Sequence, residues 1–202
     1  MSRFHTLQFN TMSIKERYHL MTSAIVPRPI ALVTSYNADA TILNAAPFSY
    51  FNGVSTDPPL IMLGLAARKE NGELVHKDST QNILQTREFV INICHVEMSD
   101  IVTKCSEPLP ANVSEVEHFG LQTIPSTHIR VPRLACSPAQ IECKLYKEIP
   151  LGPANSTLIL GEILCLHVQQ ELWENNQLNT QKLNPLARLS GQYYASLGEQ
   201  FF

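Results

Sequence analysis

The chain has 202 residues, of which 44% are hydrophobic and 16% are charged, and its formal net charge at pH 7 is −3. A chain of this length and apolar content can bury one sizeable core, so we expect a single domain over residues 1–202. The small negative charge argues against a broad basic surface, so neither nucleic acid nor an anionic membrane is expected as a partner.

The first part of the chain predicts a short helix and then two buried strands. The helix is expected over residues 14–21, and the apolar runs at residues 30–33 and 60–65 predict the strands. Between them, residues 44–49 (NAAPFS) predict a loop. Its small side chains let a ligand approach the backbone, while Asn and Ser offer hydrogen bonds to a polar ligand. A tight connection without any ligand explains the same composition.

The next stretch predicts a helix start that could hold a phosphate. Any of residues 78–80 (Asp-Ser-Thr) can cap a helix in which Ile83 and Leu84 share one face. Two hydroxyls, free backbone N–H groups and three nearby cations suit a phosphate group. The cations are Arg68, Lys69 and Lys77. A solvated, charged loop before a capped helix is the alternative interpretation.

The second half of the chain predicts mainly strands, at residues 89–93, 129–131, 139–146 and 157–169, with a short helix near residues 98–102. Pro108 and Pro110 prevent a long helix in the loop-like residues 107–121. Six or seven strands with two short helices favour a small β-barrel, closed or partly closed.

The stretch 139–146 alternates as a strand with one solvated face should. Ile141, Cys143 and Leu145 are expected to face the core, and the residues between them, Glu142 included, to face solvent. Residues 158–168 are long and apolar, which is typical of a central barrel strand. In the tail, a Tyr pair follows Gly191, where it could contact a ligand or partner subunit or close the core.

No stretch reaches the roughly 18 apolar residues of a membrane-spanning helix, so a soluble, cytoplasmic protein is expected. The five cysteines are odd in number and never form C-x-x-C, which argues against a disulfide framework and a zinc knuckle. Reduced thiols are expected, with Cys143 in the core and Cys105 accessible in a loop. The seven histidines show no metal spacing such as H-E-x-x-H, so no metal site is expected.

The sequence contains no G-x-G-x-x-G, no G-x-x-x-x-G-K-S/T and no G-x-S-x-G, so Rossmann, P-loop and serine hydrolase chemistry are not expected. Adjacent residues in a strand point to opposite faces, so Cys94 and His95 are not expected to meet, which argues against a Cys–His nucleophile. No catalytic side chain is therefore predicted.

Nine segments taken in order resemble the flavin-reductase-like, FMN-binding split-barrel family that includes flavoredoxin. They are VPRPIALVTS (26–35), NAAPFSYFN (44–52), SxDPPL (55–60), KDSxxNI (77–83), EFVIN (88–92), VPRL (131–134), IECKL (141–145), LGEI (160–163) and PLARLSGQYY (185–194). Each segment is weak alone, but their order is specific, and the resemblance covers about residues 19–194.

The resemblance implies a mainly β fold, a six-stranded Greek-key split barrel with added short helices. It also implies a homodimer with FMN at or near the subunit interface. The residues it places at the flavin ring and ribityl chain are Asn44, Ala45, Ala46 and Ser49. Those on the phosphate side are Arg68, Lys69, Lys77, Ser79 and Thr80, with Asn82 bracing that loop; Arg188 and Tyr193 are tail contacts, made within the subunit or across the dimer.

Two positions depart from the family pattern. Thr41 stands where relatives usually carry Gly, and a β-branched residue is disfavoured at positive φ, so the turn before Asn44 is expected to differ. Ser79 replaces the usual Thr but keeps the hydroxyl, so phosphate binding is little affected.

The resemblance implies an FMN-dependent oxidoreductase of the NAD(P)H:flavin reductase type. NADH or NADPH would deliver hydride to flavin N5, and the reduced flavin would pass electrons to an acceptor or a partner monooxygenase. One alternative is a non-enzymatic FMN-binding electron carrier of the flavoredoxin type. Another is a barrel that has lost FMN and serves as a structural or interaction protein.

Overall fold

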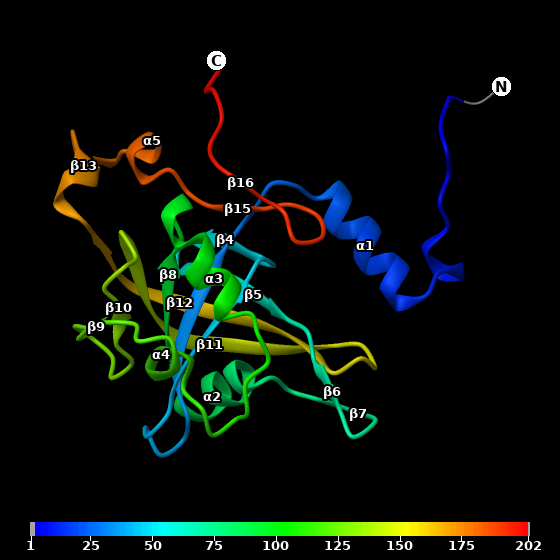
Figure 1. Ribbon diagram of the computed structural model, residues 1–202, viewed down its shortest axis with the longest axis horizontal. Helices are drawn as coiled ribbons and strands as arrows, with labels where there is room; N and C mark the ends of the chain where they lie inside the picture. Colours follow the sequence, from blue (N-terminus) through cyan, green and yellow to red (C-terminus); the bar gives the residue numbers. More distant parts are fainter. Residues whose placement is uncertain (1–2, 202) are drawn as a thin grey trace.

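A computed structural model describes residues 3–201 and is organised around one seven-stranded antiparallel sheet (Figure 1). The strands are paired in the order β3-β2-β8-β11-β12-β5-β4. In chain order they are β2 (Ala31–Tyr36), β3 (Leu43–Phe48), β4 (Phe51–Thr56), β5 (Pro59–Leu65), β8 (Glu88–Ile93), β11 (Ala139–Leu151) and β12 (Ser156–Val168).

The two edge strands of this sheet, β3 and β4, are consecutive in the chain and are separated only by Ser49 and Tyr50. The sheet therefore curls round until its edges meet at this connection, where the N–H of Gly64 donates to the carbonyl of Tyr50 at 2.7 Å. No ladder joins β3 to β4 within residues 3–201, so the barrel is split there. The mainly β, Greek-key split barrel expected from the sequence is confirmed, although its sheet has seven strands rather than the six that the resemblance implied.

Two apolar clusters fill opposite faces of the sheet because side chains alternate along each strand. Val33, Phe89 and Ile159 lie in the barrel interior. Leu32 and Val90 lie on the other face, in the outer core, which the sheet shares with the segments that cover the barrel. Gly161 is required inside, since a Cβ atom there would lie 2.4 Å from the ring of Phe89. The interior is therefore closely packed at its centre.

Helices and short strands surround the barrel. The helices are α1 (Ile14–Ala24), α2 (Asp78–Thr86), α3 (Ser99–Lys104), α4 (Glu115–His118) and α5 (Thr180–Leu183), with 3-10 turns η1 (Phe9–Thr11), η2 (Val96–Met98) and η3 (Gln170–Leu172). The short strands are β1 (Arg28–Pro29), β6 (Arg68–Glu70), β7 (Glu73–Val75), β9 (Thr123–Ile124), β10 (Arg133–Leu134), β13 (Trp173–Glu174), β14 (Gln177–Leu178), β15 (Ala187–Arg188) and β16 (Tyr194–Ala195). None of the helices in the part described is long and apolar enough to cross a membrane.

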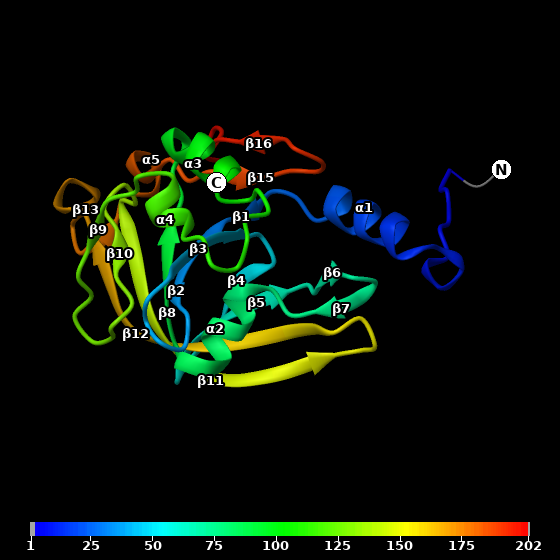
Figure 2. The ribbon, with the colours of Figure 1, turned by 60° about the horizontal axis from the view of Figure 1, so that its bottom comes forward.

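Helix α1 projects away from the barrel in both views (Figures 1 and 2). It begins with a capping box in which Ser13 and Glu16 satisfy each other's backbone N–H groups. Thr22 is its one buried residue, whereas Ile14 and Tyr18 are 73% and 54% exposed. The helix therefore owes little of its stability to packing against the rest of the chain.

Most predicted elements are confirmed, but residues 44–49 form strand β3 and a turn rather than a loop. Pro47 fits because β3 is an edge strand. The N–H of Ala45 points to the open edge of β3, where it donates to Glu115. The backbone nitrogen of Pro47, two positions later, faces the same edge and carries no hydrogen, so the proline costs no ladder hydrogen bond. The expected strand at residues 129–131 is wrong: these residues are irregular, and Ile129 and Val131 are apolar because they fill the outer core.

Three further expectations were wrong. Glu142 was expected to face solvent and is fully buried. Cys105 was expected to be accessible, but it is buried at the end of α3, where burial and then the charge of Glu115 raise the pKa of its thiol to about 12. Residues 78–80 were expected to include the helix cap, whereas the N-cap is Lys77. Cys143 lies in the core as expected.

Candidate functional site

A cavity of about 460 Å³ lies between the edge strand β3, the start of α2, the β6–β7 hairpin and the segment that follows α3. Asn44, Ala46 and Phe48 face it from β3, because alternate residues of a strand share one face. Ala46 is the smallest side chain of the three, so it leaves room beside the strand backbone. The volume is within the range of about 300–1,000 Å³ that is usual for sites of small molecules and cofactors.

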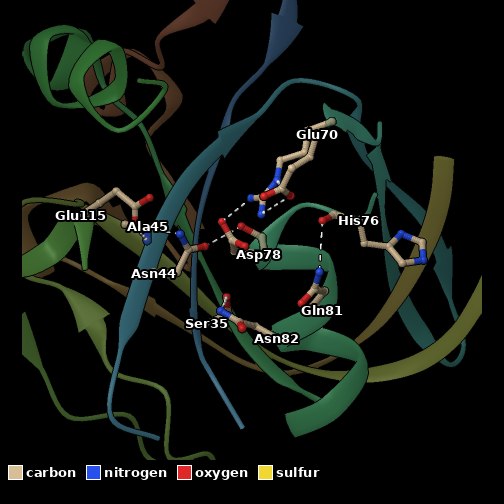
Figure 3. Close-up of polar contacts among 11 residues, drawn as sticks. Ser35, Asn44, Ala45, Glu70, His76, Asp78, Gln81, Asn82 and Glu115 are labelled. Atoms are coloured by element: carbon tan, nitrogen blue, oxygen red, sulfur yellow. Dashed lines mark hydrogen bonds and ion pairs between the residues drawn. The ribbon is translucent and has the colours of Figure 1, made fainter. Parts of the chain in front are cut away.

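Asn44 forms a hydrogen-bond network in the cavity wall (Figure 3). Its side-chain N–H donates to Glu115 Oε2 at 2.7 Å, and its Oδ1 accepts from the Ser79 hydroxyl at 2.6 Å. The backbone N–H of Ala45 donates to the same Glu115 oxygen at 3.0 Å. Asn44, Ser79 and Glu115 are all buried. The network therefore ties β3, α2 and α4 together at one point.

Helix α2 begins at this cavity without a capping side chain. Its N-cap, Lys77, makes no side-chain cap hydrogen bond, and Lys77, Asp78 and Ser79 all line the cavity. The first N–H groups of a helix have no partners within the helix, and the helix dipole gives this end partial positive charge. The arrangement suits an anionic group such as a phosphate.

The cations around α2 are not equivalent. Arg68 Nη1 donates to Asp78 Oδ2 at 2.6 Å, and Arg68 also pairs with Glu70 at 3.4 Å, so carboxylates already balance its charge (Figure 3). Burial, followed by the positive charge of Arg68, lowers the pKa of Lys77, whose ammonium lies 5.6 Å from the centre of the Phe48 ring. Within residues 3–201, neither Lys77 nor the exposed Lys69 has a carboxylate at ion-pair distance. These two lysines are the cations available to an anion.

A smaller cavity of about 150 Å³ adjoins the first and shares Pro47, Phe48 and Ser106 with it. Ser49 and Arg188 line this second cavity. Arg188 is held in place by Tyr194, whose hydroxyl accepts a hydrogen bond at 2.9 Å and whose ring lies 4.9 Å from the guanidinium carbon.

Arg28 is a buried arginine that supports the second cavity from behind. Its Nη1 donates to the carbonyls of Thr22 and Ile25 at 2.8 and 2.7 Å, and its Nη2 to that of Leu189 at 3.0 Å. Its Nε donates to Ser49 Oγ at 3.3 Å. Arg28 thus joins the end of α1, the β3–β4 connection and the C-terminal tail.

The structure brings together eight of the residues predicted for the site. The first cavity is lined by Asn44, Ala46, Arg68, Lys69, Lys77 and Ser79, and the second by Ser49 and Arg188.

The remaining four predicted residues lie elsewhere. Ala45 and Thr80 are 0% and 1% exposed and line neither cavity, because the strand and helix periods turn them into the protein. Asn82 donates to Ser35 Oγ at 3.3 Å, so it braces α2 against β2 rather than a phosphate loop. The side chain of Tyr193 is 73% exposed and lines neither cavity.

Sequence reasoning missed Glu115 and Arg28. Glu115 lies 71 positions from Asn44 in the chain, and no local sequence pattern predicts that contact. The signal for Arg28 was its place between Pro27 and Pro29, which marks a fixed backbone but not a buried charge. The departure at Thr41 is accommodated, since the positive φ of 54° falls on Ala40, and Asn37 Oδ1 accepts from the N–H of Thr41 at 2.8 Å.

Comparison with known proteins gives long matches. An uncharacterized protein of Halalkalibacterium halodurans is 38% identical over 197 residues, which cover 95% of this chain and 92% of that protein. The crystal structure of nitrilotriacetate monooxygenase component B from Bacillus cereus is 34% identical, with a TM-score of 0.93 and coverage of 100% of both chains.

Two further structures are similar. The 2-nitrobenzoate 2-nitroreductase of Pseudomonas fluorescens is 31% identical with a TM-score of 0.88, covering 98% of this chain and 94% of that one. Flavoredoxin of Desulfovibrio vulgaris shares the fold at 22% identity with a TM-score of 0.76, covering 88% and 91%. The model of the family described as "Flavin reductase like domain" matches residues 21–195. On that match and these relatives, the chain belongs to the flavin reductase-like family.

Proposed function

We propose that the chain is an FMN-dependent oxidoreductase of the NAD(P)H:flavin reductase type. The observation that carries this proposal is the 460 Å³ cavity at the uncapped start of α2, with Lys69 and Lys77 at its border and Ala46 in its wall. A cavity that offers anion-binding donors at one end and a strand with a small side chain along one side fits a phosphorylated, planar cofactor.

Different residues of the cavity would bind different parts of the cofactor. The first-turn N–H groups of α2 and the lysine ammonium groups would hold the phosphate. Ala46 leaves the β3 backbone open to a flat ring. Asn44 acts mainly through position, since both ends of its amide are engaged by Glu115 and Ser79. The smaller cavity beside Ser49 and Arg188 extends the site toward the C-terminal tail.

FMN, when bound, accepts a hydride at N5 and passes electrons on, so the protein itself needs no acid–base pair. The role of the chain is to bind the cofactor, orient it and exclude water from one side of it. NADH or NADPH would be the donor. The likeness to nitrilotriacetate monooxygenase component B supports a partner monooxygenase as acceptor, and the likeness to a nitroreductase supports a small-molecule acceptor.

We also propose that the protein works as a homodimer in the cytoplasm. Helix α1 projects from the barrel (Figure 2), and Ile14, Tyr18 and Met21 on it are exposed. Tyr193, in the C-terminal tail, is exposed as well. A second subunit packed against α1 and the tail would cover this apolar surface and bring Tyr193 toward a flavin.

The test is an anaerobic absorption experiment on the purified protein, loaded with FMN and desalted. Bleaching of a retained flavin band by NADH or NADPH at a steady catalytic rate is the expected result and identifies the donor. A retained band that neither nucleotide bleaches would overturn the reductase proposal in favour of an electron carrier of the flavoredoxin type. Failure to bind FMN at all, measured by titration, would overturn the proposal that FMN is the cofactor.

A further inference from the structure

Three side chains with metal-ligating atoms meet on the β11–β12 ladder, outside the 460 Å³ cavity. Glu142 on β11 is the cross-strand partner of Cys165 on β12, and His167 follows two residues later on the same face. A register shift directly after Glu142 locally re-aims these side chains. The carboxylate oxygen, thiol sulfur and ring nitrogen all lie within 4.8 Å of one another.

The three atoms converge on one point. His167 Nε2 lies 2.6 Å from Glu142 Oε1 and 3.3 Å from Cys165 Sγ. Both contacts are made by the same ring nitrogen. A catalytic Cys–His–Glu arrangement needs one ring nitrogen for the thiol and the other for the carboxylate, so this geometry does not build a nucleophile. Burial, and then the charge of Glu142, also raises the pKa of Cys165, which disfavours a free thiolate.

The carboxylate of Glu142 is buried and held in a fixed orientation. Its side chain is 0% exposed, its Oε1 accepts from the backbone N–H of Thr127 at 2.6 Å, and its Oε2 accepts from that of His128 at 2.7 Å. Burial opposes ionisation, but these N–H groups and His167 together lower the pKa of Glu142, so the carboxylate is an anion at neutral pH. Such fixing of a ligand by backbone groups is typical of outer-shell support in metal sites.

A buried anion needs a positive partner. His167 is the residue in contact that can supply one, and it does so only when protonated. A divalent cation in the same place would neutralise the carboxylate without requiring a protonated imidazole. It would also convert the thiol to thiolate on binding.

We propose that Glu142, Cys165 and His167 form a binding site for a divalent transition metal ion of the zinc type. One sulfur, one imidazole nitrogen and one carboxylate oxygen are the donors that Zn²⁺ takes in proteins, with bonds of about 2.0–2.3 Å. Water completes the fourth position, because Cys165 and His167 are only half-buried. The His167–Glu142 hydrogen bond opens as the ion enters between the two atoms.

The role that the position supports is structural. None of the three residues lines the 460 Å³ cavity. Through Glu142, the ion would strengthen the attachment of residues 127–128 to the central ladder, next to Ile129, which packs in the outer core. Metal binding is therefore expected to raise thermal stability and to leave flavin binding unchanged.

The experiment uses the full-length protein, reduced and stripped with a chelator, and then titrated with Co²⁺ and Zn²⁺. We expect one equivalent of Co²⁺ to give thiolate-to-metal charge-transfer absorption, and Zn²⁺ to displace it and raise the melting temperature. Cys165→Ser should abolish the charge-transfer band and weaken Zn²⁺ binding at least tenfold, about the lower end of what losing even an outer-shell partner costs.

Matched controls lie close by. Cys136→Ser removes a half-buried thiol outside the cluster. His128→Gln removes an exposed imidazole and keeps the backbone N–H through which residue 128 contacts Glu142. Both should bind Co²⁺ as the unchanged protein does. His167→Gln should lose binding, and if it fails to fold, Cys165→Ser decides the question. The proposal is overturned if the unchanged protein binds no Co²⁺ or if Cys165→Ser retains the charge-transfer band. FMN titration, measured separately, tests the proposed flavin function independently.

Discussion

The side-chain amide of Asn44 donates to the buried carboxylate of Glu115 at 2.7 Å, across 71 positions of the chain. The same carboxylate oxygen also accepts the backbone N–H of Ala45. Glu115 thereby fixes the short helix α4 to the strand that forms the cavity wall, together with the Ser114 hydroxyl, which donates to the Leu43 carbonyl. The position of Asn44, and with it the shape of the site, depends on a distant residue in the chain that also lines the cavity.

Replacing Glu115 should therefore weaken both the fold and the site. In Glu115→Ala two buried donors lose their acceptor, at a cost of about 1–3 kcal/mol each, so we expect a loss of roughly 2–6 kcal/mol in the free energy of unfolding. Urea denaturation measures the loss, and FMN titration should show weaker binding. Glu117→Ala removes an exposed carboxylate from the same helix and should change neither quantity.

Lys77→Ala should weaken binding of FMN but not of riboflavin, which lacks the phosphate. A hydrogen bond to a charged group contributes about 1.5–3 kcal/mol, which corresponds to a roughly 10- to 100-fold increase in Kd. The exposed Lys144, replaced in the same way, is the control. Equal weakening of both flavins would contradict a phosphate contact.

The same lysine gives a dependence on pH. Burial, and then the charge of Arg68, lowers the pKa of Lys77, so its ammonium loses its proton at a lower pH than an ordinary lysine. The affinity for FMN is expected to be full near neutral pH and to fall as pH rises through that lowered pKa. Fluorescence titrations across the alkaline range measure the fall, which should be absent for riboflavin and in Lys77→Ala.

Arg28→Ala should destabilise the protein by about 3 kcal/mol or more, since it leaves three buried or half-buried carbonyl acceptors without a donor. Arg28→Lys should rescue little, because an ammonium cannot reproduce the planar fork of a guanidinium. Arg130→Ala is the matched control: it breaks a 3.6 Å surface ion pair with Glu88, which contributes no more than about 1 kcal/mol. A similar loss for both arginines in thermal unfolding would argue against the bridging role of Arg28.

Gly161→Ala should disturb the barrel interior. The new Cβ atom would lie 2.4 Å from the ring of Phe89, and overpacking of this kind costs about 1–3 kcal/mol. Phe89→Leu in the same chain should recover part of the loss, which a double-mutant cycle measures. Gly53→Ala has open space at its Cβ and should be close to neutral in the same assay.

Local patterns predicted most of the strands. The apolar run at residues 30–33 and the strand pattern around Cys143 depend on the next few residues only. The two strands and the core position of Cys143 are confirmed in β2 and β11. The loop expected at residues 44–49 was wrong because the sequence does not reveal which strand lies at an edge. Pro47 disrupts a central strand but fits an edge strand.

The candidate site depended more on distant contacts. Side chains predicted on the cavity face, such as Asn44 and Ser79, do lie there, but their mutual hydrogen bond was not foreseen. Glu142 looked solvent-facing from its alternation. It is buried because the irregular segment before Ile129 folds over it and supplies two backbone N–H donors. No sequence pattern around Glu142 itself predicts its contact with that segment.

The split in the barrel has a consequence for how the molecule behaves among its own copies. An uncovered edge strand is a template on which another chain can add a strand and begin to aggregate. Here the Leu43 carbonyl accepts from the Ser114 hydroxyl, and the Ala45 N–H is taken by Glu115. Pro47 offers no N–H at all. The segment that holds Ser114 and Glu115 therefore occupies the open edge of β3, which disfavours the addition of a strand from another chain there. The carboxylate of Glu115 that protects this edge also lines the cavity, whereas a dimer contact through α1 and the tail would leave the edge untouched.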